Sequence, residues 1–187
     1  MLQDGTLRRS LVAATLLLGA TAAGARAEVM VGGQPMLPGK TIVDNAVNSA
    51  DHTTLVAAVS AAGLVDTLKS EGPFTVFAPV NRAFDALPPG TVDTLLKPEN
   101  KDTLSGILTY HVVPGRFDSE ALRQRVAAGG GKAELETVNG EMLTVKANGP
   151  GNLVLEDEQG SIATISTYDV YQSNGVIHVV ESVLHPK

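Results

Sequence analysis

The sequence predicts an α+β fold, with a helical part first along the chain and a sheet part after it. In the first two thirds of the sequence, apolar residues recur at helical spacing, as at Leu104 and Leu108. Beyond Gly131 the pattern changes to the period-two alternation that is typical of strands. Asn139-Gly140 lies between two such runs and indicates a β-hairpin. Helices followed by strands favour an α+β arrangement.

The helical part is predicted to consist of short helices. Asp51 can cap one whose apolar face includes Leu55 and Val59, and Gly63 is suited to end it. A longer helix after Pro98 reaches His111. Further helices are predicted over residues 42–47, 64–68, 83–87, 91–96 and 118–126.

The strands follow from β-branched, aromatic or alternating runs between turn residues. Asn139-Gly140 is suited to a two-residue type I′ turn, in which both residues must adopt positive φ. Strands are predicted over residues 74–79, 135–138, 141–145, 153–156, 162–167 and 176–180.

Residues 1–27 are expected to be a signal peptide. Two arginines precede an apolar run over residues 11–24, and Ala25 and Ala27 supply the small residues at a cleavage site. The run is shorter than the ~20 apolar residues that cross a bilayer, which disfavours the alternative of a retained anchor. We therefore expect the exported chain to begin at Glu28, and the arginine pair leaves both the general and the twin-arginine export routes open.

The remaining chain is long enough for one domain. Residues 28–40 contain several glycines and prolines without periodicity, so we expect a flexible lead-in, followed by a single domain over residues 41–187.

Composition excludes several classes of partner and site. The exported chain would carry 11 basic and 19 acidic residues, without the clustered cations that bind nucleic acid. Cysteine is absent, which excludes disulfides, thiolate metal ligands and a cysteine nucleophile.

Three segments together resemble the fasciclin domain family. They are residues 74–84 (FTVFAPVNRAF), residues 104–115, which end in YHVVPG, and residues 174–186, which begin with NGVIHVVE. Val80 and His185 depart from the usual family residues, so they affect local packing and hydrogen bonds. The match spans residues 41–187.

This resemblance implies a compact wedge of two β-sheets with N-terminal and central helices packed against it. It also implies an extracellular adhesion protein without a cofactor. We therefore expect a monomeric module, secreted, periplasmic or at the cell surface, that binds a cell-surface or matrix protein or polysaccharide. The alternative is a periplasmic carrier that holds a small apolar or lipid ligand in a cleft between sheet and helices.

Tyr110 and His111 are the candidate partner-binding residues, because the matching region of animal relatives is implicated in receptor contact. His111 continues the apolar helix face of Leu104 and Leu108, so we expect it to be buried and structural. Tyr110 lies off that face, and we expect its hydroxyl to reach solvent. A functional contact would therefore favour Tyr110.

Asn81, Asn174, Gly175 and His178 belong to the motifs and are expected to be structural. Asn81 follows a strand and can cap the first turn of its own helix. Asn174-Gly175 is suited to a tight turn into the last strand, which contains His178.

Catalytic and metal motifs are missing from the sequence. The adjacent acids Glu156, Asp157 and Glu158 do not have the alternating spacing of a calcium loop. The four histidines have no zinc-site spacing, and no nucleophile elbow or phosphate loop occurs. We therefore expect neither an enzyme nor a bound metal.

Overall fold

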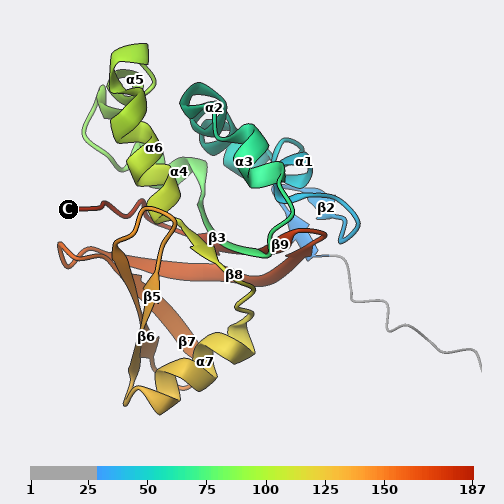
Figure 1. Cartoon of the computed structure of the whole chain (residues 1–187), viewed down its shortest axis with the longest axis vertical. Helices are drawn as coiled ribbons and strands as arrows, with labels where there is room; N and C mark the ends of the chain where they lie inside the picture. The colour runs from blue at the N-terminus through green and yellow to red at the C-terminus, as the bar shows by residue number, and fades with distance from the viewer. Residues whose placement is uncertain (1–28) are drawn as a thin grey trace, which may run out of the picture.

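The computed structural model describes residues 29–187, so the predicted signal peptide and its cleavage site lie outside the described residues. Helices gather over one end of a bent sheet (Figure 1). The helical elements are α1 (Ile42–Ala46), η1 (Ala50–His52), α2 (Thr53–Ala62), α3 (Val65–Lys69), α4 (Asn81–Asp85), α5 (Thr91–Leu95), η2 (Pro98–Asn100), α6 (Lys101–Tyr110) and α7 (Ser119–Ala128). Within residues 29–187, none of the helices is long and apolar enough to cross a membrane.

Seven strands form one sheet in the order β4-β3-β9-β8-β7-β6-β5. They are β3 (Phe74–Pro79), β4 (Val112–Pro114), β5 (Lys132–Glu136), β6 (Met142–Asn148), β7 (Asn152–Glu156), β8 (Ile162–Gln172) and β9 (Gly175–Val180). The long strand β8 pairs with β7 at its start and with β9 along the rest, with register shifts on either side of Thr167. Such irregularities bend a strand, and here they separate β5-β6-β7 from β3-β4-β9. The predicted α+β wedge is confirmed (Figure 1).

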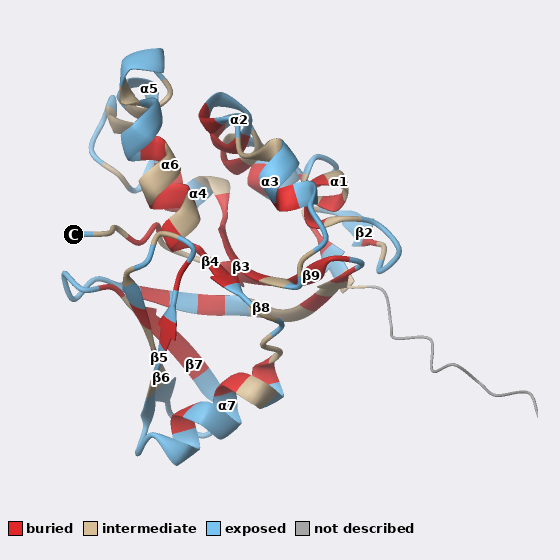
Figure 2. Cartoon of the chain, viewed as in Figure 1, coloured by how far each residue is buried: buried red, intermediate tan, exposed pale blue. Residues whose placement is uncertain are grey.

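Two apolar cores lie on opposite faces of the central strands. Because successive strand residues point to opposite faces, β3 contributes Val76 and Ala78 to the core beneath the N-terminal helices, and Phe77 to the core between the two halves of the sheet. The second core also contains Leu143 from β6 and Leu122 from α7, which covers its open side. Figure 2 shows that β3 and β9 are buried along most of their length.

The described part of the predicted flexible lead-in, residues 29–40, is not the unstructured segment that its composition indicates. It forms a hairpin of β1 (Val29–Val31) and β2 (Gln34–Met36). Val31 and Met36 are only 8% and 3% exposed and join the core beneath the helices. Gly32 has φ 59°, and a side chain there would collide with Ser49. The glycine therefore allows a close approach of the hairpin to the helical layer instead of flexibility.

Asn139-Gly140 does lie between β5 and β6, but the predicted two-residue type I′ turn is wrong. Residues 137–141 connect the strands, and of the pair only Gly140 has positive φ, at 88°. The Thr137 N–H donates to the Glu141 carbonyl at 3.0 Å, and the Gly140 N–H donates to the Thr137 carbonyl at 2.9 Å. These bonds close a longer turn in which the asparagine keeps negative φ.

Candidate functional site

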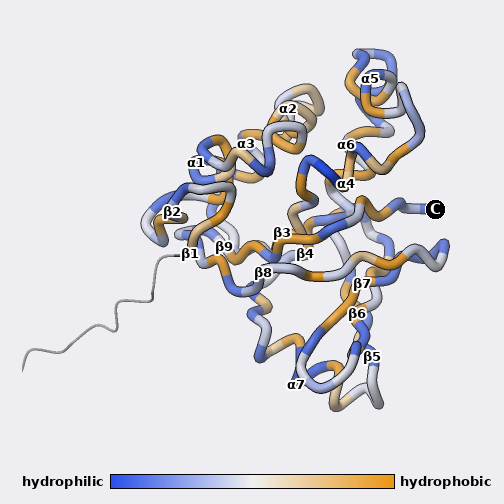
Figure 3. The backbone as a smooth tube through the Cα atoms, turned by 180° about the vertical axis from the view of Figure 1, so that it is seen from behind, coloured by the Kyte–Doolittle hydropathy of each residue, from blue (hydrophilic) through white to orange (hydrophobic). Residues whose placement is uncertain are grey.

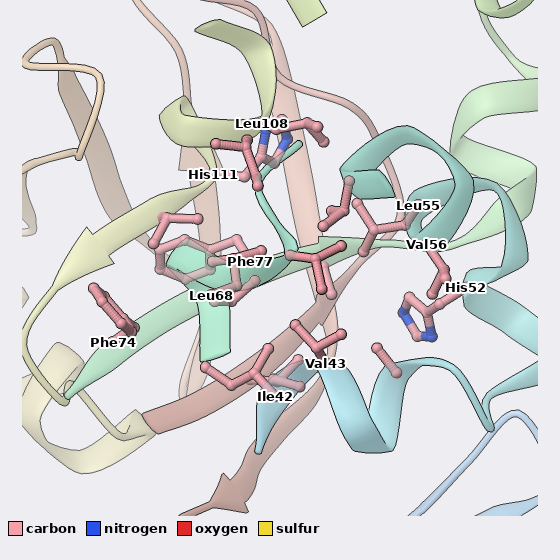
Figure 4. A pocket seen from close by; sticks show the side chains of 18 of the residues that line it. Ile42, Val43, His52, Leu55, Val56, Leu68, Phe74, Phe77, Leu108 and His111 are labelled. Atoms are coloured by element: carbon pink, nitrogen blue, oxygen red, sulfur yellow. The ribbon is translucent and has the colours of Figure 1, made fainter. Parts of the chain in front are cut away.

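A cavity of about 220 Å³ lies between the N-terminal helices and the sheet (Figure 4). Exposed residues beside three helices, Val47, Ser60 and Thr67, also line it, so it opens to solvent between α1, α2 and α3. The lining is apolar almost throughout and includes Met36, Val43, Leu55, Leu68, Val76 and Ile177. Figure 3 shows hydrophobic residues along these helices and strands, and also along β6 and β7 in the other half of the sheet.

His52 is an unusual member of this lining. Its side chain is 3% exposed, and Nδ1 lies 2.8 Å from the Ser49 hydroxyl. Nε2 is buried without a hydrogen-bond partner among residues 29–187. Burial lowers the pKa of His52, against smaller opposing effects of the nearby Ala78 carbonyl and the Asp51 carboxylate. The ring is therefore neutral near pH 7 and leaves one nitrogen free to bind.

His111 also lines the cavity, but both of its nitrogens are occupied. Nδ1 lies 2.8 Å from the Ile107 carbonyl, and the Leu184 N–H donates to Nε2 at 3.1 Å. Since Leu184 supplies the proton at Nε2, the ring carries its own proton on Nδ1 and donates it to Ile107. Burial lowers the pKa of His111 to about 4. These contacts are those of a structural residue, as its helical spacing predicts.

Tyr110 does not have the solvent-facing hydroxyl that we expected. The side chain is 0% exposed, and its hydroxyl donates to the Met142 carbonyl at 2.9 Å. Burial raises the pKa of Tyr110 to about 12. The end of α6 is covered on both sides, with Leu108 in the core beneath the helices and Tyr110 in the core between the sheet halves. At this end of α6 the Tyr110 side chain is therefore not exposed, and a role in partner binding stays a prediction.

Asn81 caps a helix, but a different helix from the one predicted. Its Oδ1 accepts from the Thr54 N–H at 3.0 Å, in the first turn of α2. Its Nδ2 donates to the Ala50 carbonyl at 2.8 Å. The side chain thus satisfies backbone groups at the start of α2, far along the chain, while α4 itself has no side-chain cap.

Asn174 and Gly175 connect segments in addition to forming a turn. Asn174 accepts from the Ile42 N–H at 3.0 Å and donates to the carbonyls of Leu68 at 2.8 Å and Ser70 at 3.0 Å. Gly175 already belongs to β9, and a side chain there would collide with the Phe74 carbonyl of the parallel neighbour β3. The pair therefore holds α1 and α3 against the sheet.

His178 is fully buried in β9. Its Nε2 lies 2.8 Å from the Phe117 carbonyl, and Nδ1 lies 3.4 Å from the Asp169 N–H. The ring stacks on Phe77 with centroids 5.6 Å apart. Burial lowers the pKa of His178, so the neutral ring has a structural role.

The acidic run 156–158 organises a turn. Asp157 is 5% exposed, and its Oδ1 accepts from the N–H groups of Gln159 at 3.0 Å and Ser161 at 2.7 Å. Its Oδ2 accepts from the His185 N–H at 3.1 Å. Among residues 29–187, no cluster of three or more histidine or acidic side chains is arranged to hold a metal.

Sequence reasoning gave a cleft between the sheet and the helices as an alternative, but it did not identify His52 or the other residues of the lining. A signal for the burial of His52 was available, since it precedes Leu55, Val56 and Val59 by three, four and seven positions on one helical face. No sequence pattern indicates the lining of the cavity, because segments that lie far apart in the sequence, such as β1-β2 and β9, assemble it.

Comparisons with known proteins agree with the three sequence motifs. The Fasciclin domain model matches residues 50–186. Protein sll1483 of Synechocystis sp. is 49% identical over 146 residues, which cover 78% of this chain and 73% of that protein. Transforming growth factor-beta-induced protein ig-h3 of Sus scrofa is 36% identical over 149 residues, 80% of this chain and 20% of that protein. The structure of a FAS1 domain pair from the insect cell adhesion molecule Fasciclin I matches with a TM-score of 0.70 at 18% identity, over 79% of this chain and 51% of that chain.

Proposed function

Because the chain belongs to the fasciclin domain family, we propose that it is a non-catalytic, exported adhesion module that binds a protein or polysaccharide on a neighbouring cell or in a matrix. Family membership is the observation that carries this proposal. Fasciclin I, whose domain pair shares the fold, is an insect cell adhesion molecule. The same fold can serve other roles, so family membership alone does not identify the contact surface.

The outer face of β6 and β8 provides such a surface. Met142 is 43% exposed, whereas the next residue, Leu143, is fully buried on the inner face. Ile162 is 56% exposed and pairs with Glu156, which pairs in turn with Thr144. Paired residues project from the same face, and Thr144 follows Met142 by two positions, so Met142 and Ile162 share the outer face. A single exposed apolar side chain is common on protein surfaces, so the proposal rests on the presence of both residues on one face of the sheet.

Single substitutions can test this surface. Ile162→Ser and Met142→Ser should each reduce attachment when they replace the natural protein in cells that lack the gene. Met30→Ser is the matched control, because Met30 is 59% exposed on the N-terminal hairpin, away from this face. Equal attachment by all three variants would exclude the outer face, and normal attachment without the gene would exclude the adhesion function.

The apolar cavity supports a second candidate function, which is carriage of a small apolar or lipid ligand. Native mass spectrometry of gently purified protein tests it. A carrier should show a species heavier than the polypeptide by the mass of the ligand. The bare polypeptide mass alone would count against carriage, and it would leave the adhesion proposal unaffected.

A further inference from the structure

We propose that the cavity binds a neutral, mainly apolar molecule that carries one hydrogen-bond-accepting oxygen, and that the Nε2–H group of His52 donates to this oxygen. The proposal rests on the carrier function proposed above, which would give this site its biological role. Binding by the purified protein, however, is measurable whether or not the protein carries such a molecule in the cell.

The contact between His52 and Ser49 determines which ring nitrogen carries the proton. Ser49 Oγ lies 2.8 Å from Nδ1, and within the described residues the hydroxyl has no second hydrogen-bond partner. Donation of the hydroxyl proton to Nδ1 satisfies both groups and leaves the ring proton on Nε2. This N–H is buried, and the nearby Ala78 carbonyl, which raises the pKa of the ring, is not placed to complete a hydrogen bond with it. An unsatisfied buried N–H is an unfavourable state for a polar group. An oxygen atom on a bound molecule would satisfy it.

Apart from Thr67, which is exposed at the rim, the other polar side chains of the lining already have partners. Both nitrogens of His111 are bonded, and the Thr109 hydroxyl donates to the Ser105 carbonyl at 2.7 Å. Lys69 is the charged residue in the described lining, and it is half-exposed at the rim and paired with Asp44 at 3.0 Å. A charged group inside the cavity would therefore be buried without a partner, which disfavours it strongly. A neutral ligand with one polar atom fits the one buried free donor of the described lining, Nε2–H of His52.

The volume limits the size of the occupant. An apolar cavity of about 150 Å³ accepts benzene, so in the same proportion 220 Å³ holds roughly nine non-hydrogen atoms. Acetophenone has this size and one carbonyl oxygen. In α-methylstyrene a methylene group replaces that oxygen, and the two molecules have nearly the same shape.

Part of the site lies outside the matched family segment. Ser49, which orients His52, and the lining residues Val31 and Met36 precede residue 50, where the family model begins to match. The matched family segment alone does not contain the complete site.

The test compares the two probes on the exported protein and on two variants. Dissociation constants for acetophenone and α-methylstyrene are measured from shifts of backbone amide resonances. His52→Phe keeps an aromatic ring and removes Nε2–H. Ala46→Phe places a larger side chain among the lining residues near the rim. Thermal unfolding confirms that each variant is folded, and His52→Leu replaces His52→Phe if the latter is not.

Both probes should bind the natural protein, and Ala46→Phe should weaken both. In His52→Phe, the preference for acetophenone relative to α-methylstyrene should fall by about 3- to 10-fold, the value of one neutral hydrogen bond. The Nε2–H resonance should move further downfield with acetophenone than with α-methylstyrene, because only the ketone accepts a hydrogen bond from it. The proposal is overturned if neither probe binds, if the ratio is unchanged in the His52 variant, or if Ala46→Phe binds both as well as before. A bare mass in the carriage experiment with normal probe binding would contradict carriage and leave the site intact.

Discussion

The backbone N–H of Leu184 donates to Nε2 of His111 at 3.1 Å, and this bond ties the C-terminal segment to the end of α6. The opposite nitrogen binds the Ile107 carbonyl at 2.8 Å. One neutral ring thus satisfies two buried backbone groups that lie far apart in the sequence. The Tyr-His pair is in this respect a structural junction.

His111→Ala should lower the free energy of unfolding by about 1–3 kcal/mol, because it leaves buried partners unsatisfied. Urea unfolding measures the loss, and attachment at matched folded concentration should be normal. His185→Ala is the control: only the backbone of His185 is bonded, so a change within about 0.5 kcal/mol is expected. A stable His111→Ala variant that fails to attach would instead make His111 a recognition residue.

Stability should decrease in mild acid. Burial lowers the pKa of His111 from an ordinary 6.5 to about 4, and burial lowers the pKa values of His52 and His178 in the same direction. Between pH 6.5 and about 4 the unfolded chain binds more protons than the folded chain. The free energy of unfolding therefore decreases as the pH is lowered through this range. His111 alone contributes a slope of up to about 1.4 kcal/mol per pH unit.

Urea unfolding at several pH values across this window measures the slope. His111→Gln should make it shallower, because glutamine does not titrate. An identical slope in this variant would contradict the assignment to His111.

Capping residues and apolar spacing correctly predict the features that depend on residues close together in the sequence. Gly63 ends α2 with φ 73°, and the Asp118 side chain accepts from the Ala121 N–H in the first turn of α7. The apolar spacing around Leu108 correctly predicts the buried face of α6. These features depend on residues within one or two turns of each other.

Features that depend on distant partners could not be predicted in this way. The sequence position of Asn81 predicts a cap for its own helix, yet its side chain accepts from the Thr54 N–H in α2. Tyr110 lies off the apolar stripe of α6, but β6 covers it and supplies the Met142 carbonyl. The cavity combines β1-β2, the helices and β9, so only the assembled fold places Nε2 of His52 in it.

Tyr110→Phe removes one hydroxyl and one buried hydrogen bond to Met142. The free energy of unfolding should fall by about 0.5–1.5 kcal/mol, as for a typical neutral hydrogen bond. Attachment should be unchanged, since the side chain is fully buried. Thermal unfolding and an attachment assay are measured together. Loss of attachment at an unchanged melting temperature would show that the hydroxyl becomes accessible when a partner binds.

Asn174→Asp tests the junction between the helices and β9. Aspartate retains an acceptor for the Ile42 N–H but loses both donors, and it places a carboxylate beside the carbonyls of Leu68 and Ser70. We expect a loss of about 1–3 kcal/mol or more in urea unfolding. Asn148→Asp, on an exposed residue at the end of β6, makes the same chemical change and should have little effect. Equal stability of the two variants would mean that the donor bonds of Asn174 contribute nothing net.

The N-terminal hairpin should contribute to stability and to the cavity, and its two methionines provide a matched test. Met36 is 3% exposed and lines the cavity, whereas Met30 is 59% exposed on the paired strand. Met36→Ala should cost about 2–5 kcal/mol, because it removes buried apolar atoms and enlarges the space beside them. Met30→Ala should stay within about 0.5 kcal/mol of the natural protein. Urea unfolding of both variants decides between a packed hairpin and a flexible lead-in, since a flexible segment would make the two substitutions equally harmless.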